Sequence, residues 1–469
     1  MLRSFTVKLT FSASLPKGSI TVSVNVQKKL KLIPGQNIVL CAGNRKVLTR
    51  FLGPHDASYD GILCVADNVQ QQLMLPSKVV VNLNIGDDNA ENWRLGPLIG
   101  IFANRFPKIN KPFGEQTSFF RKLKLAATNQ NSLCFVFGPE DVDWENKVIR
   151  GSIPPIPDDD ATGWLTMTLP FPDVIYDRGL FPKGEQRRLA TETRKILRHH
   201  PEVKMFNPAF FGKWKTHKLL SKHDDLKQHL PETRLLRSTT DVHELLQKHD
   251  CIYLKPSGGS SGKGIFRIFQ TPDGYIMNYR SKRTVNTREI TMRSFLDNRI
   301  RAITENRRYV VQQGLQLANF NGSPFDIRII MQRNLHGDWL RTGMAARVAK
   351  KGCYISNIHA GGHAQRVSTI LAQVFPDPQT ADSTINEIRR ICALIVSWVT
   401  AESSPLFGEI AVDLGVDESG KVWIIELNAI PGRSVFRHTK SVVILAQAIA
   451  RPMEYAYYLS GFEGPANNI

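Results

Sequence analysis

Two segments that lie far apart in the chain constrain its fold more than any other feature. The first, residues 251–265, predicts a strand that ends in a lysine and leads into a glycine-rich loop. The second, residues 408–432, predicts a pair of strands that carry acidic and amide side chains. We expect the two segments to hold a nucleoside triphosphate from two sides, because one offers phosphate donors and the other offers metal ligands.

The glycine-rich run Gly258-Gly-Ser-Ser-Gly-Lys-Gly264 is not a P-loop. A P-loop needs G-x-x-x-x-G-K-[ST], whereas Ser257 stands at its first glycine position and Gly264 follows the lysine. The glycines carry no Cβ, so their backbone N–H groups can approach phosphate oxygens, and Lys263 adds a positive charge. A plain surface loop has the same composition, so this run alone leaves both interpretations open.

Lys255 favours the phosphate interpretation. It ends an otherwise apolar strand, and burying an ammonium group is costly unless an anion pairs with it. The alternative is a strand-end lysine that reaches solvent. The candidate phosphate-binding residues of this segment are Lys255, Gly258, Gly259, Ser260, Ser261, Gly262, Lys263 and Gly264.

The second segment predicts a magnesium site. Residues 409–413 and 422–426 have strand composition and are separated by the turn signal of residues 417–420. Strand alternation places Glu426 and Asn428 on one face, and the hairpin brings Asp413 to the same place. Three hard oxygen ligands suit Mg²⁺, which shares its other positions with water and phosphates. Each residue alone also fits a structural role, but the three together fit one poorly.

Composition excludes several classes of protein. With 469 residues, 42% of them hydrophobic and 22% charged, the chain is expected to form about three globular domains. It has no apolar run of membrane-spanning length, and residues 1–10 alternate like a strand rather than a signal peptide, so we expect a cytoplasmic protein without membrane insertion. The six cysteines lack metal-site spacing and predict reduced thiols.

The net charge of +19 leaves nucleic acid or a polyanionic substrate open as partners. The basic residues are dispersed, and no zinc-finger spacing or aromatic RNA-binding signature accompanies them. We therefore expect no nucleic-acid function as the main role. Binding to DNA or RNA that weakens steeply with salt would indicate the opposite.

The chain is expected to be organised as a β-rich module at 1–95, a small α/β domain at 96–205, a core at 206–462 and a tail at 463–469. The module predicts a small barrel or sandwich, with strands at 21–26, 37–40 and 79–85. The second domain predicts a mostly parallel sheet that includes a strand at 95–102. In the core, helices are expected at 219–230 and 381–402. No internal repeat is expected.

The whole pattern resembles the ATP-grasp superfamily: a strand lysine before a glycine-rich loop, then an Asp, a Glu-x-Asn and a Pro-Gly. Over most of the chain it is similar to the YheC/YheD-like ATP-grasp family of spore-forming bacilli. The residues that carry this similarity lie in Leu95–Ile101, Phe325-Asp-Ile-Arg328, Asn357-Ile-His-Ala-Gly-Gly362 and Val422–Asn428. The resemblance implies an α+β or α/β chain, in which an ATP-grasp fold follows a pre-ATP-grasp-like α/β domain and a barrel-like module.

The resemblance also implies roles for residues that spacing does not identify. Lys213 matches the first phosphate-binding lysine of such a core, and Gln312, Gln313, Gly314 and Leu315 match the hinge whose backbone binds adenine. Gln312 and Gln313 stand where many relatives have a glutamate. The metal ligands are implied to be Asp413, Glu426 and Asn428, and the cleft residues implied to be catalytic are Arg328, Arg347 and Asn357.

The implied activity is an ATP- and Mg²⁺-dependent carboxylate–amine ligase that forms an acyl-phosphate. D-alanine ligase-like members have an arginine two residues before the metal aspartate, where this chain has Ala411, so Arg328 or Arg347 would stabilise that intermediate. His359 and His363 are open to roles in proton transfer or packing. The implied partners are ATP, an unidentified acid and amine, other spore-coat proteins and a second copy of the chain. The alternative is an ATP-binding spore-envelope protein with weak or lost catalysis.

Overall fold

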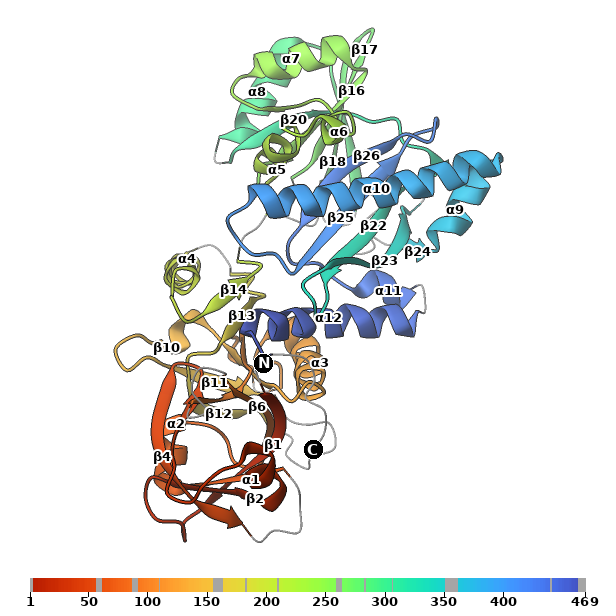
Figure 1. Ribbon diagram of the computed structural model, residues 1–469. Helices are drawn as coiled ribbons and strands as arrows, with labels where there is room; N and C mark the ends of the chain where they lie inside the picture. The colour runs from red at the N-terminus through yellow and green to blue at the C-terminus, as the bar shows by residue number, and fades with distance from the viewer. Residues whose placement is uncertain are drawn as a thin grey trace. The chain divides into compact units, whose positions relative to one another are not determined.

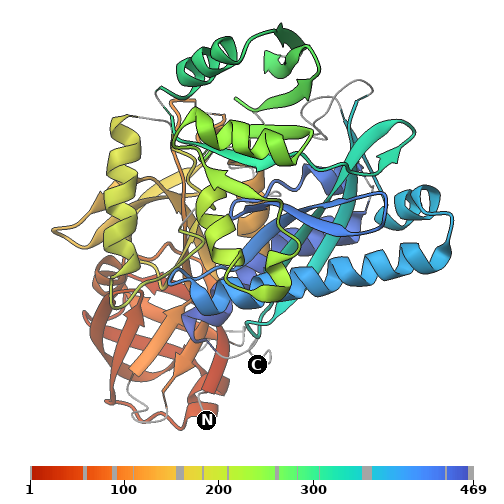
Figure 2. The same ribbon diagram turned by 90° about the horizontal axis from the view of Figure 1, so that it is seen from above.

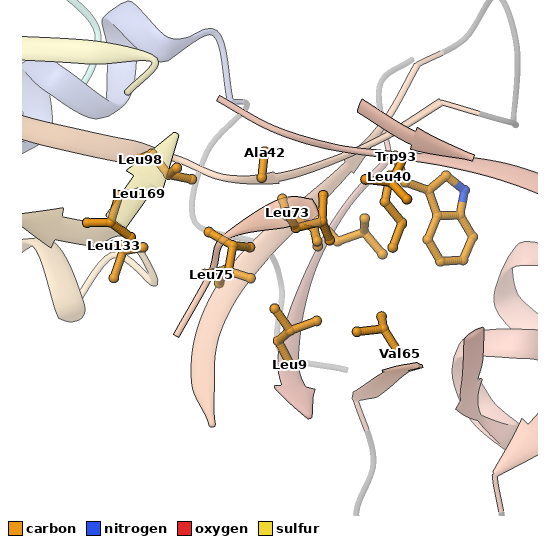
Figure 3. Close-up of a cluster of buried hydrophobic side chains, with 14 of the residues drawn as sticks. Leu9, Leu40, Ala42, Val65, Leu73, Leu75, Trp93, Leu98, Leu133 and Leu169 are labelled. Carbon is orange, nitrogen blue, oxygen red and sulfur yellow. The ribbon is translucent and has the colours of Figure 1, made fainter. Parts of the chain in front are cut away.

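The N-terminal strands form a closed β-barrel, drawn in red in Figure 1. The computed structural model describes residues 3–55, 61–86, 92–108, 110–154, 163–181, 184–208, 211–258, 264–281, 284–305, 307–350, 362–438 and 441–462. The barrel strands are β1 (Arg3–Ser12), β2 (Ser19–Ser23), β3 (Asn37–Ala42), β4 (Arg45–His55), β5 (Ile62–Ala66), β6 (Val79–Ile85) and β7 (Asn92–Gly96). Alternate side chains fill its interior, including the fully buried Leu9, Leu40 and Trp93 shown in Figure 3.

The barrel contains an internal repeat, so the expectation of a chain without repeats is wrong. The series β1, β2, α1 (Val24–Leu30), β3 recurs as β4, β5, α2 (Asp67–Leu73), β6. Matching strands make matching pairs: β1–β5 and β4–β2 are parallel, and β1–β6 and β4–β3 are antiparallel. The barrel is therefore two interlocked copies of one motif, and β7 is inserted between β3 and β6.

The two short helices of this repeat also end in the same way. Gln27 donates its side-chain amide to the Leu32 carbonyl at 3.2 Å, and Gln70 donates to the Leu75 carbonyl at 3.3 Å. The expected strand at 21–26 is corrected at this place, because β2 ends at Ser23 and the chain turns into α1. The alternation of apolar and polar residues that predicted a strand continues into α1. In this helix Val26 is the buried residue.

A seven-stranded sheet follows the barrel, with order β10-β11-β9-β8-β13-β14 and β12 paired to β11. Its elements are β8 (Leu98–Phe102), β9 (Leu133–Phe137), β10 (Val142–Asp143), β11 (Val148–Ile153), β12 (Leu165–Pro170), β13 (Val174–Asp177), β14 (Lys204–Phe206), α3 (Thr117–Thr128) and α4 (Glu185–Arg198). Strands β9, β8, β13 and β14 are parallel neighbours. The strand expected at 95–102 is divided, because β7 ends in the barrel at Gly96 and β8 begins the sheet at Leu98.

A second sheet, of order β15-β20-β16-β17-β18-β19, is covered on one face by α7 and α8. Its elements are β15 (Thr233–Leu235), α7 (Thr239–Lys248), β16 (Cys251–Pro256), β17 (Phe266–Thr271), β18 (Gly274–Ser281), β19 (Thr284–Ile290), α8 (Arg293–Thr304) and β20 (Tyr309–Gln313). The preceding helices are α5 (Lys213–Leu220) and α6 (Asp224–Lys227). The helix expected at 219–230 is therefore wrong, since α5 ends where it was expected to begin.

A third sheet has the order β24-β23-β22-β25-β26, with β21 paired to β22. Helices α9 and α10 cover one face, and Figures 1 and 2 both show α10 lying along it. The elements are β21 (Asn319–Phe320), β22 (Ser323–Arg333), β23 (Trp339–Val348), β24 (His363–Gln365), α9 (Val367–Val374), α10 (Pro378–Glu402), β25 (Glu409–Val416), β26 (Val422–Asn428), α11 (Ser434–His438) and α12 (Val442–Ser460). Helix α10 begins where Asp377 accepts hydrogen bonds from the Gln379 and Thr380 amides.

The chain divides into two compact units. One comprises Met1–Pro208, Arg333–Asp338 and Ile449–Ile469, and the other comprises Ala209–Gln332 and Trp339–Ala448. The second half of α12 thus groups with the first unit rather than with the core expected at 206–462. Of the helices that the structure describes, none is both long and apolar enough to cross a bilayer.

Candidate functional site

Three neighbouring strands of the third sheet bring charged side chains together around Asp413. Asp413 on β25 lies opposite Arg328 on β22 and opposite Glu426 on β26. The residues before and after it, Val412 and Leu414, belong to the core beneath α9 and α10. Because side chains alternate along a strand, the charged residues share the face of the sheet that these helices leave uncovered.

Two arginines hold the carboxylate of Asp413. Arg328 donates from both Nε and Nη2, the latter at 2.6 Å, and Arg347 Nη2 lies 3.0 Å from Oδ2. Burial would raise the pKa of Asp413, but the charges of Arg328 and Arg347 outweigh it and hold the pKa below its ordinary value. Asp413 is therefore an anion in a buried place, as a metal ligand must be.

Arg347 is held in turn by a second carboxylate. Its Nε and Nη2 donate to the two oxygens of Asp326 at 2.5 and 2.6 Å. Burial would lower the pKa of Arg347, but Asp413 and Asp326 together raise it, so the guanidinium stays charged. Asp326 belongs to the Phe325–Arg328 motif, but no role was predicted for it from the sequence. The signal was available, because Asp326 and Arg328 are two positions apart on one strand and so share a face.

Two lysines converge on the other side of the site. Lys213, at the start of α5, donates to Glu426 Oε1 at 3.2 Å. Lys255, at the end of β16, donates to Gln312 Oε1 at 2.5 Å, and Gln312 donates onward to Thr233 Oγ1 at 2.8 Å. A pocket is lined by Lys213, Lys255, Gln312 and Glu426 together with apolar side chains of α5 and β26.

The electrostatics of this pocket favour an anion. Burial, together with the nearby Lys213 charge, lowers the pKa of Lys255 to about 8, and Glu426 only partly offsets this. Because burial disfavours the charged form of this ammonium group, a phosphate bound beside it would stabilise that form strongly. The side-chain oxygen of Gln312 gives the Lys255 ammonium group a hydrogen-bond acceptor.

The hinge between β20 and the third sheet has most of its donors occupied. Gln313 N donates to the Glu232 carbonyl at 2.8 Å, and Gly314 N donates to the Cys251 carbonyl at 2.7 Å. The side-chain oxygen of Gln313 accepts from Glu232 N at 3.1 Å. Among the described residues, the amide of Leu315 has no such acceptor.

The acidic and amide residues fit a magnesium ion by their chemistry. Asp413 and Glu426 supply two carboxylates and Asn428 an amide oxygen, from one face of the β25–β26 pair. Both carboxylates are paired to cations, Asp413 to two arginines and Glu426 to Lys213. In the described ranges no three His, Cys, Asp or Glu side chains form a metal-binding group.

Several predicted residues lie outside the part of the chain that the structure describes: Gly259, Ser260, Ser261, Gly262, Lys263, Asn357, His359 and Gly361. The ends of the glycine-rich loop are described. Ser257 accepts from Lys213 N at 2.9 Å, and Gly264 has a φ of 74°, which glycine adopts without strain. Gly258 is exposed, and His363 on β24 contacts Gln365 Nε2 at 3.0 Å.

Comparison with known proteins identifies the family. A model described as YheC/D like ATP-grasp matches residues 202–459. The chain belongs to the YheC/D-like ATP-grasp family. The expected fold class is confirmed, with a β-barrel and a mixed α/β sheet preceding the ATP-grasp core.

Two relatives in this family come from Bacillus subtilis (strain 168). Endospore coat-associated protein YheD is 31% identical over 404 residues, which cover 84% of this chain and 85% of that protein. Endospore coat-associated protein YheC is 22% identical over 273 residues, which cover 58% and 74% respectively. Most of the length of YheD thus has a counterpart in this chain.

Solved structures also align with this ATP-grasp chain. D-cycloserine synthetase DcsG aligns with a TM-score of 0.44 at 11% identity, over 76% of this chain and 99% of that chain. The ATP-grasp ligase PsnB, complexed with minimal precursor, aligns with a TM-score of 0.44 at 12% identity over the same shares.

A buried polar network lies behind the site on the same face of the third sheet. Arg433 donates to Glu409 Oε2 at 2.5 Å and to the Pro431 carbonyl at 3.2 Å, and Gln332 donates to the same Glu409 oxygen at 2.9 Å. Glu409 and Gln332 are fully buried. The network ties the turn after Asn428 to β25. The network could not be predicted from the sequence, because nothing in the local pattern marks a glutamate at a strand start as buried.

Proposed function

We propose that this protein is an ATP- and Mg²⁺-dependent carboxylate–amine ligase. The observation that carries the proposal is the pocket of the second unit, where Lys213, Lys255, Gln312 and Glu426 meet. Two lysines beside a carboxylate suit a triphosphate and its metal rather than a neutral ligand. Membership in the ATP-grasp family supports the same conclusion.

The nucleotide would lie with its phosphates at the lysines and its base at the hinge. Lys213, Lys255 and the loop residues Gly258 to Gly264 are proposed to hold the phosphates. Leu315 would supply the backbone donor to adenine, because the amides of Gln313 and Gly314 are already engaged. The side chains of Gln312 and Gln313 are engaged as well, so base recognition would rest on the backbone.

Asp413, Glu426 and Asn428 would hold Mg²⁺, which neutralises phosphate charge during phosphoryl transfer. Lys213 would then exchange its contact with Glu426 for one with a phosphate oxygen. The two arginines would keep Asp413 ionised throughout. This exchange would account for the pairing of Glu426 with Lys213 in the free protein.

The proposed reaction has two steps. The substrate carboxylate attacks the γ-phosphorus of ATP, which forms an acyl-phosphate and releases ADP. The amine then attacks the acyl carbon, and phosphate leaves with the carbon–oxygen bond electrons. Arg328 or Arg347 would stabilise the charge on the transferred phosphoryl group, since Ala411 offers no arginine, and Asn357 would lie near the acceptor.

The test is ADP release in the presence of acids, amines and peptides. We expect turnover that needs one acid and one amine together, and that falls at least about a hundredfold in Glu426→Ala. Glu418→Ala, on the exposed turn of the same hairpin, is the matched control and should keep full activity. Equal turnover in Glu426→Ala would rule out the metal assignment.

A second candidate function is ATP-dependent assembly in the spore envelope with weak or lost catalysis. The relatives' description as endospore coat-associated proteins favours it. In that case ATP would bind tightly without turnover for every acid and amine, and the chain would be recovered with coat proteins from purified spores. Association with coat proteins and formation of a homodimer are compatible with either function.

A further inference from the structure

The second sheet, of order β15-β20-β16-β17-β18-β19, carries a basic cleft on the face opposite the nucleotide pocket. Four arginines line it: Arg237 before α7, Arg301 in α8, and Arg307 and Arg308 before β20. The cleft measures about 700 Å³. We call it the arginine groove.

The groove is separate from the proposed nucleotide site. Leu254 of β16 and Val311 of β20 point into the core under α7 and α8, which is the side of the groove. Lys255 and Gln312, the next residues along each strand, line the nucleotide pocket instead. Alternation along the strands therefore puts the two sites on opposite faces of one sheet.

The arginines of the groove differ from those of the site in lacking partners. Arg328, Arg347 and Arg433 are each ion-paired. Within the described residues, none of the four groove arginines makes an ion pair. Glu305 is the one acid among the described lining residues, so the groove has an excess of positive charge. The hydroxyls of Ser238 and Thr239 add further polar groups to the lining, whereas the Thr304 hydroxyl donates to the Ile300 carbonyl at 2.9 Å.

The shape and lining indicate the class of ligand. A cleft of about 700 Å³ is larger than one phosphate needs, and it has room for several side chains. Guanidinium groups pair bidentately with carboxylates. Single-stranded nucleic acid needs exposed ring faces for stacking, but the aromatic lining residue, Tyr309, is only 3% exposed. We propose that the arginine groove binds a carboxylate-rich peptide segment of a partner protein.

The experiment measures fluorescence anisotropy of a labelled peptide of alternating Glu and Gly, at low salt and without ATP. A peptide with Gln in place of Glu is the probe control. Because no ATP is present, the outcome does not depend on the proposed ligase activity. We expect the Glu peptide to bind and the Gln peptide not to bind.

The groove variant is Arg301→Gln with Arg307→Gln, and the matched variant is Arg187→Gln with Arg188→Gln on the exposed face of α4. We expect the groove variant to weaken binding roughly tenfold, since each exposed pair contributes modestly, and the matched variant to leave it unchanged. Unaltered ATP binding would show that the groove variant is folded.

Three outcomes would overturn the proposal. The first is absence of binding by the Glu peptide. The second is equal weakening in both double variants, which would indicate a diffuse effect of net charge. The third is tighter binding of an oligothymidine of equal charge that the groove substitutions abolish, which would indicate a nucleic-acid site.

Discussion

Burial and charge oppose each other at Lys255. Its ammonium group ends an apolar strand, lies near Lys213 and has a pKa lowered to about 8. It is supported by the side-chain oxygen of Gln312 at 2.5 Å. A triphosphate would stabilise the charged form, so nucleotide binding and protonation of Lys255 should be coupled.

ATP affinity should therefore fall as pH rises above about 8, by up to roughly tenfold for each further pH unit. The free protein loses the Lys255 proton in this range, and binding ATP must restore it. Calorimetry in two buffers of different ionisation enthalpy would measure the proton taken up. Lys255→Arg should bind ATP without this pH dependence, because a guanidinium does not titrate there. The same steep dependence in Lys255→Arg would assign the titration to another group.

The same lowered pKa has the opposite effect on folding. The unfolded chain binds the Lys255 proton more tightly than the folded chain, so this group's contribution to stability rises as pH increases from about 8 towards 10.5. ATP affinity and intrinsic stability should therefore change in opposite directions above pH 8.

At the scale of elements, the turn after β26 is held by the buried network of Glu409, Gln332 and Arg433. We expect Arg433→Met to destabilise the protein by about 3–5 kcal/mol, because it leaves the Glu409 carboxylate buried without a cation. Urea unfolding would measure this. Arg389→Met on the exposed face of α10 is the control and should stay within about 0.5 kcal/mol of the parent.

A double variant tests whether the charge pair itself is the cause. Glu409→Leu combined with Arg433→Met should be less destabilised than Arg433→Met alone, because no unpaired charge remains. Additive losses would mean that packing, and not charge, accounts for the effect.

The boundaries of helices and strands show where the sequence pattern was sufficient to predict an element. Strand β6 begins and ends as expected for residues 79–85. Its apolar run is bounded on both sides by clear turn residues. The expected strand at 21–26 and the expected helix at 219–230 were wrong, because apolar periodicity continued across a change of chain direction.

At the scale of the whole molecule, α12 belongs to two units. Its second half packs Met453, Tyr455 and Leu459 against the core of the seven-stranded sheet, including Ile99 and Phe120. Residues at the end of the chain thus complete a domain that begins near residue 98. A core contact of this kind joins parts of the sequence that no local signal connects.

We expect Met453→Ala to destabilise the first unit by about 2–5 kcal/mol, since Met453 is fully buried. Hydrogen exchange should become faster in β8 and α3 and stay unchanged in β22 and β25. Leu371 is buried in the core of the third sheet. Leu371→Ala should therefore speed exchange in the second unit and leave exchange in β8 and α3 unchanged. Faster exchange in both units of Met453→Ala would mean that they unfold together.

The sequence by itself determined which residues were chemical candidates. Glu426 and Asn428 follow from strand alternation, Asp413 follows from a short hairpin, and Lys255 follows from an ammonium group at the end of an apolar strand. Each of these depends on contacts between residues close in the chain. Their roles in the reaction remain predictions.

Only the tertiary structure decided which oppositely charged or hydrogen-bonding side chains surround those candidates. Arg328 meets Asp413 because β22 and β25 are neighbours in the sheet, and Lys213 meets Glu426 because α5 packs beside β26. The barrel repeat and the arginine groove likewise depend on pairings between distant segments. Local periodicity specifies which face a side chain takes, but strand order and helix packing arise from the burial of the whole apolar surface, which no short segment contains.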